Sequence, residues 1–144
     1  MWTLEKSIET SAPTACIWEL FADVGRWKDY NADLEAIEIE GPFETGTSFT
    51  MTIPGQNALR STLIEVIPGE SFKDETVIDE TRIVVCHRLV PLPSGHTKII
   101  YSTEIIGPGA DQFGPMVTSD FGDILEKLKK LAESLQCISK LQNT

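Results

Sequence analysis

The sequence lacks any long hydrophobic run. Its unbroken apolar stretches are only a few residues long, far short of the ~20 residues that a membrane-spanning helix needs. The first ten residues alternate in polarity and predict a strand rather than a basic, apolar export signal. We therefore expect a soluble protein with no membrane insertion.

Basic residues are scarce. The chain has 12 Lys and Arg against 22 Asp and Glu, which gives a net charge of -10 at pH 7. Affinity for nucleic acid depends largely on Lys and Arg side chains that neutralise phosphates. The charge therefore argues against nucleic-acid binding and against anionic membrane surfaces. The acidic residues are spread along the chain, as is typical of residues that keep a protein in solution.

Cysteine and histidine are also few. Cys16, Cys86 and Cys137 are odd in number and widely separated, which predicts buried free thiols in a reducing compartment and hence a cytoplasmic protein. Neither His87 nor His96 has a Cys or carboxylate at metal-ligand spacing, so we expect no metal. The chain has no glycine-rich phosphate loop and no nucleophile motif, so we expect no cofactor.

What the chain does contain is a series of short strands. Its 144 residues, 41% of them hydrophobic, fit one domain over 1–144 with a real core. Alternating apolar residues and turn signals predict about seven strands joined as antiparallel hairpins, at 2–9, 37–39, 49–53, 59–67, 72–78, 81–90 and 97–106. Two short helices are expected after the first strand, the first of them beginning at Pro13.

The last third of the chain predicts one long helix. Apolar residues recur there at steps of three or four, as on one face of a helix: Val117, Phe121, Ile124, Leu128, Leu131, Leu135 and Ile138. A helix over 111–141 would be roughly 45 Å long at ~1.5 Å per residue, enough to cross a sheet. The expected fold class is α+β, a curved antiparallel sheet of about seven strands wrapped around this helix.

Several short motifs follow one another in a specific order and spacing. They include Ser11-Ala12-Pro13, Asp23-Val24-Gly25-Arg26-Trp27, Gly41-Pro42-Phe43, Glu65-Val66 with Pro68-Gly69, His87-Arg88-Leu89 and Gly107-Pro108. Together, over roughly 2–135, they resemble the polyketide cyclase/dehydrase-like branch of the START/Bet v 1 (SRPBCC) superfamily. The resemblance implies a helix-grip fold with a hydrophobic ligand cavity between the sheet and the long helix. It does not imply one reaction, because the superfamily includes lipid carriers, receptors, cyclases and chaperone activators.

The resemblance also suggests which side chains line such a cavity. Ligand sites are mostly apolar with few polar groups, and the same residue types equally form an ordinary core. The candidate ligand-binding residues are Trp27, Tyr30, Phe49, Met51, His87, Tyr101, Phe113, Met116, Val117 and Phe121.

Three polar side chains are candidates for chemistry in the cavity. Tyr101 and His87 each fall on the apolar face of a predicted strand, because side chains alternate between faces. Asp74 lies on the strand that a tight turn joins to that of His87. We hypothesise that Asp74 and His87 form a polar pair, in which the carboxylate fixes the tautomer of the imidazole. A bulge would separate the two, and a purely structural pair fits the pattern equally well.

Three functions remain open at this stage. Binding of a small hydrophobic or aromatic ligand needs only the cavity. A cyclase/dehydrase-type enzyme would also need converged polar groups, with His87 and Asp74 moving protons. A protein-interaction module of the chaperone-activator type would use an exposed face instead. An edge strand also leaves room for a homodimer, which the charge alone does not decide.

Overall fold

The computed structural model describes residues 1–32, 34–52, 55 and 57–142, with side chains up to residue 135. The elements in chain order are β1 (Trp2–Thr10), α1 (Thr14–Ala22), the 3-10 helix η1 (Val24–Asp29), β2 (Ala36–Ile39), β3 (Ser48–Thr52), β4 (Leu59–Ile67), β5 (Ser71–Ile78), β6 (Thr81–Pro91), β7 (Thr97–Ile106), α2 (Ala110–Thr118) and α3 (Phe121–Gln142). The predicted strands agree with these bounds to within a residue or two, and the expected end of the third strand at Ile53 lies outside the described residues.

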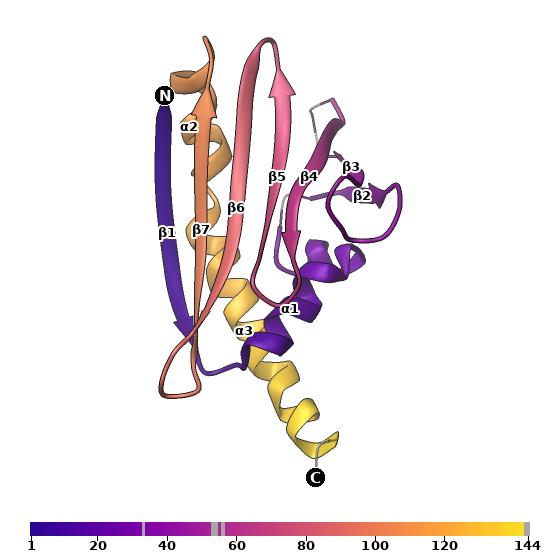
Figure 1. Ribbon diagram of the computed structural model, residues 1–144, viewed down its shortest axis with the longest axis vertical. Helices are drawn as coiled ribbons and strands as arrows, with labels where there is room; N and C mark the ends of the chain where they lie inside the picture. Colours follow the sequence, from indigo (N-terminus) through magenta and orange to yellow (C-terminus); the bar gives the residue numbers. More distant parts are fainter. Residues whose placement is uncertain (33, 53–54, 56, 143–144) are drawn as a thin grey trace.

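The strands form one antiparallel sheet in the order β1-β7-β6-β5-β4-β3-β2. Strands β2 to β7 pair with their neighbours in sequence, as hairpins do, and β1 joins the free edge of β7. Figure 1 shows α2 and α3 following one another along one face of the sheet, with α1 beside α3. This arrangement confirms the predicted α+β fold, a curved sheet with its helices on one side.

A two-residue turn sets the register between β5 and β6. Asp79 and Glu80 both have positive φ, 46° and 69°, as the two central residues of a type I′ hairpin turn do. Ile78 and Thr81 therefore pair directly, and the register continues without a shift to Ser71 opposite Arg88. Because no bulge interrupts this pair of strands, the faces that the alternation predicts for β5 and β6 hold along their whole length.

The C-terminal helix differs from the prediction of one continuous element. It is divided into α2 and α3 by a turn at Ser119 and Asp120. Serine and aspartate favour the start of a helix over its interior, because their side chains compete for backbone hydrogen bonds. The N–H of Ile124 donates to the carbonyl of Asp120 at 2.9 Å. Asp120 therefore stands at the beginning of α3.

The inner face of α3 follows the predicted stripe. Phe121, Ile124 and Leu128 are buried, whereas Leu131 and Leu135 are partly buried against the same core. The side chain of Ile138 lies outside those that the structure describes. The stripe packs on the sheet and on α1, whose buried residues are Cys16, Ile17, Leu20 and Phe21.

Two further expectations concern thiols and membranes. Cys16 is buried and Cys86 is half-buried, and both are free thiols; the side chain of Cys137 is not among those described. In the described part of the chain, no helix combines the length and the apolar character that a bilayer crossing requires. The cytoplasmic location stays a prediction.

Two helix glycines give a test of how α2 is held. A Cβ atom on Gly114 would collide with the indole of Trp2, whereas one on Gly122 would meet only Lys6 Nζ, at 3.8 Å. We expect Gly114→Ala to lower the free energy of unfolding by about 1–3 kcal/mol through overpacking. Gly122→Ala should raise it by up to about 1 kcal/mol through helix propensity. Urea unfolding measures both, and equal effects of the two variants would show that α2 does not need this close approach.

Candidate functional site

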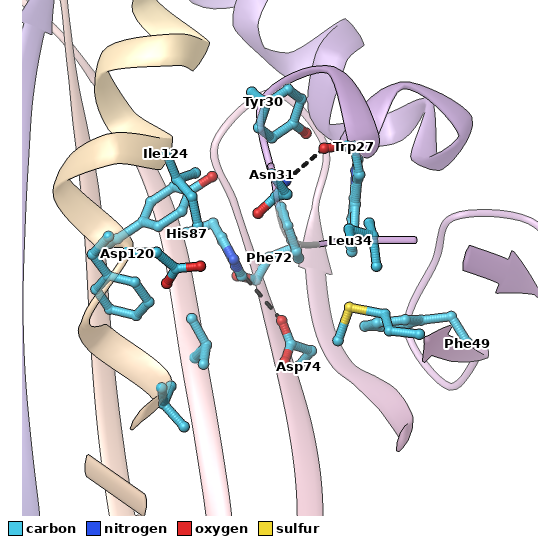
Figure 2. A pocket seen from close by; sticks show the side chains of 15 residues that line it. Trp27, Tyr30, Asn31, Leu34, Phe49, Phe72, Asp74, His87, Asp120 and Ile124 are labelled. Carbon is cyan, nitrogen blue, oxygen red and sulfur yellow. Dashed lines mark hydrogen bonds and ion pairs between the residues drawn. The ribbon is translucent and has the colours of Figure 1, made fainter. Parts of the chain in front are cut away.

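A cavity of about 180 Å³ lies between the inner face of the sheet and the helices. Figure 2 shows α3 on one side and the segment around Trp27 and Asn31 on the other, with β5 and β6 between them. The lining side chains come from η1 and the following loop, four strands and the α2–α3 junction: Trp27, Tyr30, Asn31, Leu34, Phe49, Met51, Phe72, Asp74, Val85, His87, Tyr101, Val117, Asp120, Phe121 and Ile124. Most of this wall is apolar or aromatic, as in ligand sites generally.

The floor of the cavity is a row of three rings, which we call the ring row: Phe72, His87 and Tyr101. Strand pairing places them directly side by side, Phe72 opposite His87 and His87 opposite Tyr101. The imidazole stacks on Phe72 with centroids 3.9 Å apart and meets Tyr101 edge to face at 4.6 Å. Phe21 of α1 contacts all three rings from the helix side. The imidazole is therefore held by packing.

The segment around η1 closes another side of the cavity, and its polar atoms fix it in place. The indole N–H of Trp27 donates to the carbonyl of Phe21 at 2.9 Å. The hydroxyl of Tyr30 donates to the carbonyl of Leu20, also at 2.9 Å. Both carbonyls belong to the last turns of α1, where helix carbonyls lack an intrahelical partner. The side-chain amide of Asn31 donates to the carbonyl of Trp27 at 2.7 Å.

His87 and Asp74 lie close together without a direct hydrogen bond. The imidazole Nδ1 is 3.3 Å from the carbonyl of Phe72 and 3.8 Å from Asp74 Oδ2. A carbonyl can only accept, so the hydrogen bond to Phe72 requires the proton on Nδ1 and leaves Nε2 as an acceptor. Asp74 pairs with Val85, two residues from His87. The two polar groups therefore sit on neighbouring strands, one step apart along the inner face.

Burial acts on the two groups in opposite directions. It lowers the pKa of His87 to about 3, although the hydrogen bond to Phe72 raises it. It raises the pKa of Asp74 to about 7. Near neutral pH the imidazole is therefore uncharged and Asp74 is poised between its two forms. The 3.8 Å separation is within ion-pair range, but desolvation disfavours both charged forms, so we describe a close polar pair rather than a salt bridge.

The tyrosines of the cavity remain protonated. Burial, with smaller contributions from Asp74 and Asp120, raises the pKa of Tyr101 above the ordinary tyrosine range. Burial, followed by the proximity of Tyr101, Asp23 and Asp29, raises that of Tyr30 well above the same range. Among the residues that the structure describes, the carboxyls in the lining are Asp74 and Asp120. Within the described residues, no three His, Cys, Asp or Glu side chains converge to hold a metal ion.

All but two of the expected lining residues border this cavity. The exceptions are Phe113 and Met116. Phe113 packs over Gly109 and joins a separate apolar cluster with Ile83 and Ile105. Met116 is 56% exposed, because α2 turns Ala110, Gly114 and Thr118 toward the core and position 116 outward. The expectation that these two residues line the cavity is corrected accordingly.

Sequence reasoning missed several lining residues: Asn31, Leu34, Phe72, Val85, Asp120 and Ile124. Three of these carried a usable signal. Phe72 shares a strand face with Asp74, Val85 shares one with His87, and Ile124 belongs to the apolar stripe of the terminal helix. Asn31 and Leu34 lie in an irregular segment with no periodicity. The place of Asp120 in the lining depends on the break between α2 and α3, which the sequence pattern did not predict.

A family comparison agrees with this architecture. Residues 1–133 match the model of a family described as polyketide cyclase/dehydrase and lipid transport. The chain belongs to this polyketide cyclase/dehydrase family. A search of curated proteins finds no match.

Solved structures share the fold of this family member. The Zhui aromatase/cyclase from a Streptomyces species is similar over 93% of this chain and 94% of its own, with 15% identity and a TM-score of 0.78. Norcoclaurine synthase from Thalictrum flavum, in complex with dopamine and hydroxybenzaldehyde, matches over 92% and 87% with 20% identity and a TM-score of 0.73. Ara h 8.0201 matches over 92% and 98% with 16% identity and a TM-score of 0.74. At these identities the likeness establishes the helix-grip fold.

The pKa of Asp74 predicts how the stability of this cyclase-family protein depends on pH. Between the ordinary carboxyl pKa and about 7, the folded state binds a proton at Asp74 that the unfolded chain has lost. Asp74 therefore lowers stability progressively as pH rises through that window. Asp74→Asn keeps the shape without the charge. We expect it to raise the free energy of unfolding at pH 8 by about 1–4 kcal/mol and to change it little at pH 4.

Urea unfolding at both pH values measures this effect. His87 contributes the opposite slope, because its lowered pKa makes stability rise between about pH 3 and 6.5; it is present in both proteins and cancels in their difference. The matched control is Asp123→Asn, an exposed carboxyl paired with Lys127, which should change stability by less than about 1 kcal/mol. A variant at Asp74 that is less stable than wild type at pH 8 would contradict the assignment.

Proposed function

We propose that the protein binds a small hydrophobic molecule, one aromatic ring in size, in the cavity over the ring row. The observation that carries this proposal is the cavity volume of about 180 Å³. An apolar cavity of about 150 Å³ suffices for benzene, whereas drug-sized ligands occupy about 300–1,000 Å³. A single ring with a short substituent fits this range, and a fused polyketide does not.

The chemistry of the walls supports an aromatic guest. Phe49, Phe72, Tyr101 and Phe121 present faces and edges, which pair favourably with another ring in offset or edge-to-face geometry. Dopamine and hydroxybenzaldehyde, the molecules in the norcoclaurine synthase complex, are single rings of the size that we propose here. An apolar cavity of this kind also favours ligand binding over a chaperone-activator role, which needs only an exposed face.

Filling the cavity should abolish binding. Val85 lines the cavity, whereas its neighbour Val84 lies on the opposite face of β6. We expect Val85→Phe to weaken binding of phenethyl alcohol by at least about tenfold, because the added ring occupies the space of the guest. Val84→Phe should leave the affinity unchanged. Calorimetric titration measures both variants, and native mass spectrometry of freshly purified protein reports any retained natural ligand. Equal affinities in the two variants would place binding outside this cavity.

A second candidate function is proton transfer on the bound molecule. Its specific support is Asp74, whose pKa is raised to about 7 and which stands beside a neutral imidazole. A general acid or base works best when its pKa is near the working pH. The family description includes cyclases and dehydrases, and both reactions move protons next to carbonyl groups.

Deuterium exchange tests this candidate directly. Phenylacetone has acidic protons beside its carbonyl and is one ring in size. We expect the wild-type protein to speed their exchange with solvent deuterium, with a rate that rises through pH 7 as Asp74 ionises. Asp74→Asn should reduce the enzymatic rate by about 100-fold or more while phenethyl alcohol still binds. NMR measures the exchange rate. Equal rates for the wild type and Asp74→Asn would reject catalysis by Asp74 and leave ligand binding as the proposed function.

A further inference from the structure

The hydrogen-bond donors around the cavity are already engaged with the backbone. The indole N–H of Trp27, the hydroxyl of Tyr30, the Nδ1–H of His87 and one amide N–H of Asn31 each point to a backbone carbonyl. The donors that remain in the lining are the second amide hydrogen of Asn31 and the hydroxyl of Tyr101. A ligand that needs several hydrogen-bond donors from the protein therefore fits this cavity poorly.

The carboxyl of Asp74, by contrast, is an acceptor without such a partner in the described part of the chain. Asp74 is only 8% exposed, and its carboxyl makes no side-chain hydrogen bond within the described residues; it lies 3.8 Å from His87 Nδ1. Figure 2 shows this carboxyl below the imidazole and Asp120 at the start of α3 across the cavity. The lining, all of it within the described residues, contains no lysine or arginine. The polar part of the cavity thus consists largely of acceptors, two of them carboxyls.

We propose that the ligand is an aromatic amine, a single ring whose short side chain ends in an ammonium group that pairs with Asp74. This inference rests on the proposed binding function and narrows its ligand class. An ammonium group supplies three donors and a positive charge, and the described lining offers few free donors and no lysine or arginine. It would complete the hydrogen bonding of a buried carboxyl that the protein itself leaves incomplete.

The same lining discriminates against an acid. A ligand carboxylate would bring a further negative group beside Asp74 and Asp120 with no cation to offset it, which is costly in a desolvated site. A neutral alcohol can donate one hydrogen bond and should bind with intermediate affinity.

Binding of an amine should also depend on pH. Among the described residues, the titratable groups that share the cavity wall with Asp74 are His87 from β6, Tyr101 from β7, Tyr30 from the segment after η1 and Asp120 from the helix junction. The imidazole is neutral and the tyrosines are protonated over the range of interest. An ammonium needs the ionised carboxyl, so at low pH its binding must release the proton of Asp74. Its affinity should therefore fall by up to about tenfold per pH unit below pH 7, and that of a neutral alcohol should not.

Three matched ligands test the inference: phenethylamine, phenethyl alcohol and phenylacetate. By calorimetry at pH 8 we expect the amine to bind at least about tenfold more tightly than the alcohol, and phenylacetate to bind most weakly. Asp74→Asn should lower the affinity for the amine by at least about tenfold and the affinity for the alcohol by less than about threefold. If that variant does not fold, Asp120→Asn should lower the affinity for the amine by a smaller factor and leave the affinity for the alcohol unchanged. Asp111→Asn, an exposed charge change on α2, is the control that should alter neither affinity.

The possible outcomes separate the two proposals. An alcohol that binds as tightly as the amine, or a phenylacetate that binds more tightly, overturns the inference about the amine and leaves the binding function standing. An amine affinity that is unaffected by Asp74→Asn, or that does not fall between pH 8 and pH 5, also overturns it. If none of the three ligands binds, the proposed function fails and this inference fails with it.

Discussion

The register of β5, β6 and β7 is the constraint on which the site depends. The two-residue turn at Asp79 and Glu80 aligns β5 with β6, and the pairing of β6 with β7 places Tyr101 beside His87. A slip of one residue would turn Phe72, His87 and Tyr101 from the inner face to the outer face, because the side-chain period of a strand is two. The ring row, the burial of the imidazole and its distance from Asp74 all follow from these two alignments.

The helices α2 and α3 form the wall of the cavity opposite the sheet. α2 reaches the edge of the sheet because Gly114 leaves room for the indole of Trp2, and the break after Thr118 allows α3 to start anew over the ring row. The N-terminal turn of α3 then contributes Asp120 and Phe121 to the cavity wall. Asp120 stands in the turn between the two helices. The interruption is therefore part of the site.

Burial is the main electrostatic influence in the cavity, and it gives the polar pair its character. The same loss of water that holds His87 neutral raises the pKa of Asp74 toward neutrality. A protein that only needed a filled core would be more stable with an apolar residue in place of such a carboxyl. Perturbed groups in a concave apolar site are typical of functional sites, and the burial that costs stability at Asp74 also brings its pKa into the range that proton transfer needs.

The sequence by itself determined the elements and their faces. Alternation placed His87, Tyr101 and Asp74 on inner faces, and turn residues marked the hairpins, because these signals are local properties of the chain. The shared cavity, the 3.8 Å between Asp74 and His87, the outward direction of Met116 and the role of Asp120 were decided by the tertiary structure alone. They depend on how separate elements pack and where a helix restarts, and no short-range pattern records the distance between residues that only folding brings together.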